Sequence, residues 1–320
     1  MLVNLYESKT PIAVFSFPLL VAIVVCPILF LEVQAIHYPF EWQNDLWSMI
    51  HEIKWLNFIL AVFLISTNAH QINNAYNSTV LYSKDSFLPG LIYLISLVAL
   101  SAYDFAPILV AHFFFILAMR QLFKIRRQED AKAIVFKASL LFGIGFVFSP
   151  MQSVCFIIPA LSLTVFRPFV WREWFMVVGG GFIAVIYYLS VIYLSTGQLS
   201  FFSTPHYGFQ NAKQVDLITW VNWTIFGLIA LGSIVKYFAI MRTEINRFKK
   251  QSQVLFHMTW VSFIGFVLGW YFYSEMYPVF ILPLSIIVGT QLLHSRNSKV
   301  VNAIVIIWLI ISVANVVIVG

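Results

Sequence analysis

Long apolar stretches, separated by short polar ones, extend through the whole chain of 320 residues. Eleven of these segments predict helices, and none shows the alternation of about ten residues that is typical of membrane β-barrel strands. A helix needs roughly 20 apolar residues to cross a hydrocarbon core of about 30 Å. The pattern therefore predicts an all-α, polytopic transmembrane protein with about eleven spans. The expected spans are Pro11–Leu31, Leu56–Asn68, Phe87–Ala102, Pro107–Phe123, Phe136–Ser149, Gln152–Phe166, Trp174–Leu194, Ile218–Tyr237, Leu255–Tyr273, Pro278–Leu293 and Val300–Val319.

The basic residues orient this predicted bundle. Of the nineteen Lys and Arg residues, seventeen fall in connections on one side, and only Lys54 and Lys213 fall on the other. Cytoplasmic loops of membrane proteins are enriched in Lys and Arg. We therefore expect the N-terminus in the cytoplasm and the C-terminus outside, in a bacterial inner membrane. The first segment has no small-residue cleavage site after it, so we expect a retained helix and not a signal peptide.

Composition excludes a soluble globular protein. Hydrophobic residues make up 61% of the chain and charged residues only 10%, whereas about 25% of the residues of a soluble domain are charged. Basic cytoplasmic loops that face anionic membrane lipids account for the net charge of +6. Nucleic acid is therefore not an expected partner. Because there is no linker or low-complexity stretch, residues 1–320 are expected to form a single transmembrane domain.

Two segments of the predicted outer face are too long to be simple turns. In the first, residues 32–55, the second half winds as a helix that places Leu46, Trp47, Ile50 and Ile53 on one side. Such an amphipathic helix is expected to lie along the membrane surface. The second, residues 195–219, is rich in Gly, Pro and Ser and is expected to be a loop. Its aromatic residues, with His206 and Tyr207 among them, suit either sugar stacking or contact with lipid.

The largest predicted cytoplasmic feature is the basic segment Arg120–Lys137. It has the charge to dock another envelope protein or to bind anionic lipid. A solvated cytoplasmic loop explains the same charge pattern.

Carboxylates near the apolar segments are the leading candidates for chemistry, because ionisable groups are costly there. Glu32 ends the first span, Asp104 lies in a short turn, and Glu275 lies between the ninth and tenth spans. Partial desolvation raises the pKa of such a carboxyl group, which suits a general base or a cation ligand. An interfacial acid that faces water remains the alternative for each. No phosphate-binding loop, dinucleotide fingerprint or HExxH zinc motif occurs, so cofactor and metal stay open. The small residues Gly179–Gly181 predict a close helix contact.

The layout resembles that of glycosyltransferase-C membrane proteins, which use polyprenyl-phosphate sugars at the outer membrane face. The likeness covers about two-thirds of the chain. It rests on the first helix that ends at Glu32, the long outer segment, the acidic turn at Asp104, and the stretches KASLLFGIGFVFSPMQSVCFIIPALSLTVFRPFVWREW and MYPVFILPLSIIVG. In addition, NNAYNSTVLYSKDSFLPGLIYLI followed by APILVAHFFFILAMRQLF resembles an uncharacterised family of inner-membrane proteins from Bacteroidota.

The glycosyltransferase-C resemblance implies specific roles. Glu32 or Asp45 matches the catalytic acid of the first outer loop, and Asp104 matches a second acidic position that some members use for a metal. Lys54 and Lys213 are the two basic residues of the predicted outer face. One of them would therefore contact the phosphate of a polyprenyl-phosphate lipid. The family generally places Arg or Lys near its late proline helix, whereas this chain has an acid there, and it has no DxD pair outside.

Three functions follow as hypotheses. The first is an enzyme that transfers a glycosyl or related group from a polyprenyl-phosphate donor. The second is a non-catalytic subunit or assembly factor of an envelope machine for secretion, motility or polysaccharide export, which the missing outer cations favour. The third is a transporter, and the scarcity of charges near the middle of the spans disfavours it.

Overall fold

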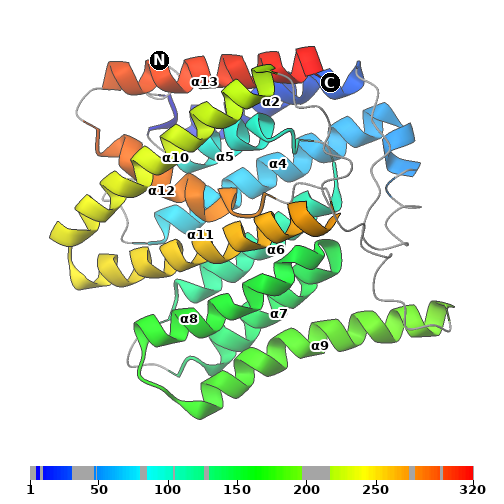
Figure 1. Cartoon of the computed structure of the whole chain (residues 1–320), viewed down its shortest axis with the longest axis vertical. Coiled ribbons are helices and arrows are strands. Elements are labelled where there is room, and N and C mark those ends of the chain that lie inside the picture. Colours follow the sequence, from blue (N-terminus) through cyan, green and yellow to red (C-terminus); the bar gives the residue numbers. More distant parts are fainter. Residues whose placement is uncertain are drawn as a thin grey trace.

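Every regular element among the described residues is helical in the computed structural model (Figure 1). The structure describes residues 5–7, 10–30, 47, 49–79, 85–103, 105–125, 130–196, 217–273, 278–295 and 298–319. The elements are α2 (Pro11–Val25), η1 (Cys26–Leu29), α4 (Lys54–Asn77), α5 (Leu88–Ala99), α6 (Pro107–Leu122), α7 (Lys132–Phe148), η2 (Pro150–Phe156), α8 (Ile157–Phe166), α9 (Trp171–Thr196), α10 (Leu217–Thr243), α11 (Asn246–Tyr273), α12 (Ile281–Leu293) and α13 (Ser298–Val319).

Each of the predicted apolar segments contains a helix, which confirms the all-α prediction. Within the described residues, six stretches are long and apolar enough to cross a membrane. They are Pro11–Leu29, Lys54–Asn77, Trp171–Leu194, Leu217–Thr243, Asn246–Gly269 and Lys299–Ile318. The other predicted spans form shorter helices. The number of crossings and the orientation of the bundle stay predictions.

Large apolar side chains cover the outward surfaces of the peripheral helices. Phe15 of α2 is 81% exposed and Leu194 of α9 is 84% exposed. Soluble proteins rarely expose extended apolar patches, whereas lipid tails cover such surfaces in a bilayer. The long apolar helices and their apolar outer surfaces together make the chain a multi-pass membrane protein.

Two short helices, α5 and α12, form the centre of the bundle (Figure 1). Every residue of α5 is buried, and so is α12 from Ile281 to Gln291. The two helices pack closely at Gly289, where an added Cβ atom would lie 3.0 Å from the ring of Pro89. With 12 and 13 residues, they are only about 18–20 Å long. They contact the longer helices α4, α10, α11 and α13, which separate them from lipid.

Side chains from other helices pair the ends of α5. In its first turn, the backbone N–H of Gly90 donates to Asn73 Oδ1 of α4 at 2.8 Å. At its last residue, the carbonyl oxygen of Ala99 accepts a hydrogen bond from Asn222 Nδ2 of α10 at 3.2 Å. Backbone groups at helix ends lack partners within the helix, and leaving one buried and unpaired costs about 1–3 kcal/mol. The two asparagines therefore hold α5 in its axial position.

Helix α9 packs along α7 at the edge of the bundle (Figure 1). A Cβ atom added to Gly180 would lie 2.5 Å from the carbonyl oxygen of Phe136, and one added to Gly143 would lie 2.5 Å from Ala184 Cβ. The close helix contact predicted for Gly179–Gly181 is therefore confirmed at Gly180.

Two helices extend well beyond their apolar segments. The second span was predicted over Leu56–Asn68, but α4 covers Lys54–Asn77. Its added residues are polar yet partly buried, and the buried Asn73 pairs with α5. Similarly, α11 begins at Asn246 and not at Leu255. An apolar run in the sequence predicts only the part of a helix that contacts hydrocarbon or the protein core. It does not predict helical turns whose polar groups pair with other parts of the protein or lie in the headgroup layer.

We expect Gly180→Leu to destabilise the protein, because the larger side chain meets the backbone of α7. Overpacking of this kind costs roughly 1–3 kcal/mol and should lower the thermal unfolding midpoint in detergent. Gly179→Leu is the matched control, since a Cβ atom there meets nothing within 4 Å. Equal midpoints for the two variants would contradict the close contact of α7 and α9.

Replacing Asn73 by alanine should lower the free energy of unfolding by about 1–3 kcal/mol, because the Gly90 N–H is left buried without its acceptor. The adjacent Asn74 is only half-buried, and Asn74→Ala should stay within about 0.5 kcal/mol of the parent. Denaturant or thermal unfolding in detergent measures both. A larger loss for Asn74→Ala would argue against the pairing of α4 with α5.

Candidate functional site

Most of the residues that the sequence nominates lie outside the described residues. These are Glu32, Asp45, Asp104, His206, Tyr207, Lys213 and Glu275. Lys54 is described, and it is the exposed first residue of α4. The structure therefore informs on the surroundings of the nominated acids through their neighbours in the chain.

The segment around Trp47 rests on the turn between α5 and α6. The ring centroids of Trp47 and Phe105 are 4.8 Å apart. His51 Nε2 lies 2.7 Å from the carbonyl oxygen of Phe105, and the backbone N–H of Phe105 donates to Asn57 Oδ1 of α4 at 3.0 Å. The described part of the first long predicted outer segment is thus held against the short turn that follows α5. We call this the Phe105 end of the bundle.

The expected helix in the first outer segment is confirmed in part. Residues 47 and 49–52 are helical, while Leu46 lies outside the described residues. Trp47 is only 4% exposed, and Ile50 packs against the hydrophobic core, whereas Ile53 is half exposed. On the expected apolar side, Trp47 and Ile50 therefore face protein and not the membrane surface. The sequence could show that the segment is amphipathic but not what its apolar side contacts.

The turn after α5 has a well-defined backbone. Ser101 has a positive φ of 54°, the Ala102 N–H donates to the Leu97 carbonyl at 2.9 Å, and the Ser101 N–H donates to the Val98 carbonyl at 3.1 Å. This pair of hydrogen bonds is the Schellman ending of a helix. Pro107 then begins α6, where its fixed φ and missing N–H suit a first helical turn. The Schellman ending of α5 and the proline at the start of α6 therefore define the two ends of the Phe105 turn.

A buried polar cluster, formed by Asn68, Tyr93 and His112, joins α4, α5 and α6. Asn68 Nδ2 donates to the Leu109 carbonyl at 2.9 Å and to the Tyr93 hydroxyl at 3.3 Å. The Tyr93 hydroxyl lies 3.1 Å from His112 Nδ1. A hydroxyl that accepts from Asn68 keeps its own proton for Nδ1, which places the ring proton on Nε2. Among the described residues, nothing accepts a hydrogen bond from this buried Nε2.

Sequence reasoning missed this cluster. In the sequence, His112 is one of seven histidines without metal-ligand spacing, and Asn68 is the last residue of the second predicted span. A polar residue inside an apolar segment was the available signal, but only the fold shows that three such residues from three helices meet. Because the ring is fully buried, the cluster is suited to fixing the helices relative to one another.

The opposite end of the bundle is held together by charged groups. Arg167 Nη1 lies 3.2 Å from Glu173 Oε1, and their side chains are 13% and 3% exposed. The same carboxylate accepts from the Ala131 N–H at 3.4 Å, while Lys250 Nζ donates to the Phe166 carbonyl at 3.4 Å. These contacts connect the adjoining ends of α7, α8, α9 and α11. We call this the Arg167 end.

The basic segment 120–137, nominated as a partner surface, is engaged with the protein where it is described. Arg120 donates to Gln71 Oε1 of α4. Asp130 accepts from the backbone N–H of Lys132 at 3.0 Å and from its Nζ at 3.1 Å, and these hydrogen bonds lower the pKa of the Asp130 carboxyl group. Lys124 and Lys137 are exposed. Binding of a partner through this segment stays a prediction.

No group of three or more His, Cys, Asp or Glu residues that could hold a metal ion occurs among the described residues. The acids of the predicted outer face are outside that set.

Comparison with models of known protein families, with characterised proteins and with solved structures finds no match to this chain.

We expect His51→Ala to loosen the segment around Trp47 from the Phe105 turn. The lost hydrogen bond to the Phe105 carbonyl is worth about 0.5–1.5 kcal/mol, so hydrogen exchange of residues 49–53 should speed up about threefold to tenfold. Glu52→Ala, at the exposed neighbouring position, is the control and should leave exchange unchanged. The same increase in both variants would show that His51 does not hold the segment.

Proposed function

We propose that the protein is an enzyme of a bacterial inner membrane that transfers a glycosyl group from a polyprenyl-phosphate donor, with its reaction site at the Phe105 end. The observation that supports this proposal is the contact between Trp47 and Phe105. Two segments of the predicted outer face, far apart in the chain, meet there. Each of them carries a nominated acid.

Chain connectivity brings these acids close to the contact. Asp45 precedes Trp47 by two residues, and Asp104 is bonded directly to Phe105. Consecutive Cα atoms are 3.8 Å apart, so a separation of two residues spans at most about 7 Å. In this proposal, both carboxylates therefore belong to one small region of the site. In the proposed reaction, Asp45 or Glu32 accepts the proton of the acceptor hydroxyl as its oxygen attacks the sugar. The bond between the sugar and the phosphate breaks, and the polyprenyl phosphate leaves with the electron pair. Asp104 supports the reaction as a second acid or as a metal ligand.

Lys54 supplies a contact for the donor phosphate in this proposal. It is exposed and is the first residue of α4, where the helix dipole and the unpaired N–H groups also favour an anion. Asn57, one turn along the same helix, already contacts the Phe105 turn. The same end of α4 therefore carries Lys54 and contacts the turn next to Asp104. Lys213 remains a second candidate for the phosphate.

A non-catalytic subunit of an envelope machine is the alternative function, and the surface of α9 favours it. This helix packs mainly on α7 and extends past its neighbours at its C-terminal end (Figure 1). Tyr187 and Leu194 there are 72% and 84% exposed. An apolar helix face of this kind suits a partner helix in the membrane as well as lipid.

The deciding experiment measures sugar transfer from a polyprenyl-phosphate donor by the protein in proteoliposomes. Asp45→Asn, Asp104→Asn and Glu32→Gln are compared at equal protein levels. Removing a general base typically costs about 10²–10⁴ in rate, so at least one of these variants should lose about 100-fold or more. Glu52→Gln, an exposed acid of the same segment, is the matched control.

Retained transfer in all three variants would contradict the assigned roles. No transfer by the parent protein, together with a stoichiometric protein partner in native mass spectrometry of gently extracted membranes, would favour the subunit instead.

A further inference from the structure

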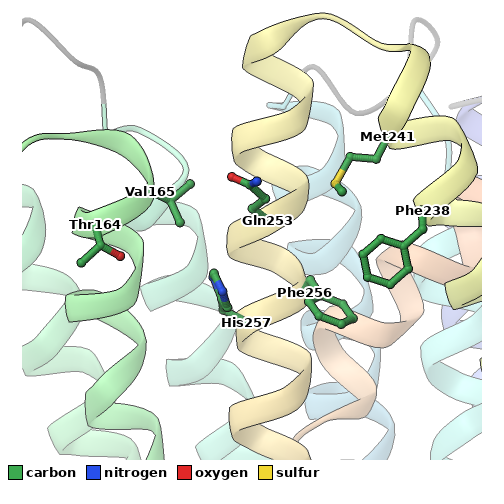
Figure 2. Close-up of a pocket in the computed structure, with 7 residues that line it drawn as sticks. All are labelled: Thr164, Val165, Phe238, Met241, Gln253, Phe256 and His257. Carbon is green, nitrogen blue, oxygen red and sulfur yellow. The ribbon is translucent and has the colours of Figure 1, made fainter.

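A groove on the surface of the bundle lies between α8 and α10, with α11 as its floor (Figure 2). The pocket has a volume of about 380 Å³. Val165, Phe238, Met241 and Phe256 give it apolar walls. Farther along α11, Trp260 is 50% exposed, so the apolar surface continues beyond the pocket. A groove with these walls is suited to a hydrocarbon chain.

One side of the groove is polar and lies on a single face of α11. Lys250, Gln253 and His257 are three and four residues apart, a spacing that places them above one another on a helix. Figure 2 shows His257 directed from α11 toward Thr164 and Val165 of α8. Its Nδ1 atom is buried and has no hydrogen-bond partner among the described residues. The polar side therefore has capacity for further hydrogen bonds.

Lys250 lies where the groove approaches the Arg167 end. Its Nζ is 3.4 Å from the Phe166 carbonyl at the end of α8, so the side chain reaches from α11 toward α8. An ammonium group has three donors, and among the described residues the Phe166 carbonyl accepts one hydrogen bond from this ammonium group. Arg167, the next basic side chain, is already paired with Glu173. Lys250 is thus the cation best placed to meet an anion at the entrance of the groove.

The length of α11 places this entrance at the depth of lipid headgroups. The helix has 28 residues and is therefore about 42 Å long, which exceeds the hydrocarbon thickness of about 30 Å. Its first turns carry Arg247, Lys249 and Lys250, and basic residues suit the interface with anionic lipid. The apolar walls formed by Phe256 and Phe238 lie deeper along the bundle. From its entrance inward, the groove is first basic and then apolar, which matches the phosphate and the acyl chain of a phospholipid.

We propose that this groove is a binding site for one anionic phospholipid. The phosphate binds Lys250, the polar backbone of the lipid meets Gln253 and His257, and one acyl chain lies between α8 and α10. The site is at the opposite end of the bundle from the proposed reaction site and does not depend on it. The lipid bridges α8, α10 and α11, and so it stabilises the Arg167 end.

The test uses the full chain in nanodiscs of equimolar phosphatidylglycerol and phosphatidylcholine. Native mass spectrometry after gentle extraction measures the ratio of the two lipids that stay bound. The parent protein should retain phosphatidylglycerol in preference. Lys250→Ala should lower this preference about tenfold, as expected for the loss of one charge-assisted hydrogen bond.

Lys249→Ala is the matched control, because it removes an equal charge one residue away, about 100° around the helix axis from Lys250. Equal losses for Lys249→Ala and Lys250→Ala would overturn the proposal in favour of diffuse surface charge. Equal retention of both lipids by the parent protein would overturn it as well.

A second measurement needs no variant. Phosphatidylglycerol with a photoreactive acyl chain should label the α11 peptide that contains Phe256 and His257 in the parent protein. Labelling confined to other peptides would place the bound lipid elsewhere and contradict the assignment.

Discussion

A peptide group inside a bilayer has no water to pair with, and this constraint governs how the bundle is built. Helices satisfy most backbone groups internally, but their ends do not. Here asparagines complete the pairing: Asn73 and Asn222 at the two ends of α5, and Asn57 at the turn that follows it. Since α5 lies at the centre of the bundle, the positions of α4, α6, α10 and α12 depend on these few side chains.

Hydropathy predicted the helices well, because a run of apolar residues has few alternatives in a membrane. It failed where polar residues are buried by protein, as in the extension of α4 through Asn73. The residue that pairs with such a polar group lies in a different helix, so the local sequence does not reveal it. For the same reason, the cluster of Asn68, Tyr93 and His112 was not predictable. The candidate acids followed from position in the predicted topology, and the structure adds the contact of Trp47 with Phe105 that relates two of their segments.

The two ends of the bundle are stabilised by different physical means. At the Phe105 end, aromatic packing and hydrogen bonds to the backbone surround a tight turn. At the Arg167 end, a buried ion pair and a lysine join several helix ends, and buried pairs of this kind are sensitive to the loss of either partner. The proposed chemistry and the proposed lipid site are therefore separable, and each can vary without disturbing the other.

The enclosed position of α5 and α12 has a consequence for biosynthesis. Neither helix is long enough to be recognised alone as a membrane span, so each has to enter the bilayer together with a neighbour such as α4 or α13. Pro89 emerges early from the ribosome and its contact at Gly289 emerges late. The partly inserted chain therefore holds an unfinished interior around α5 until α12 has also been made.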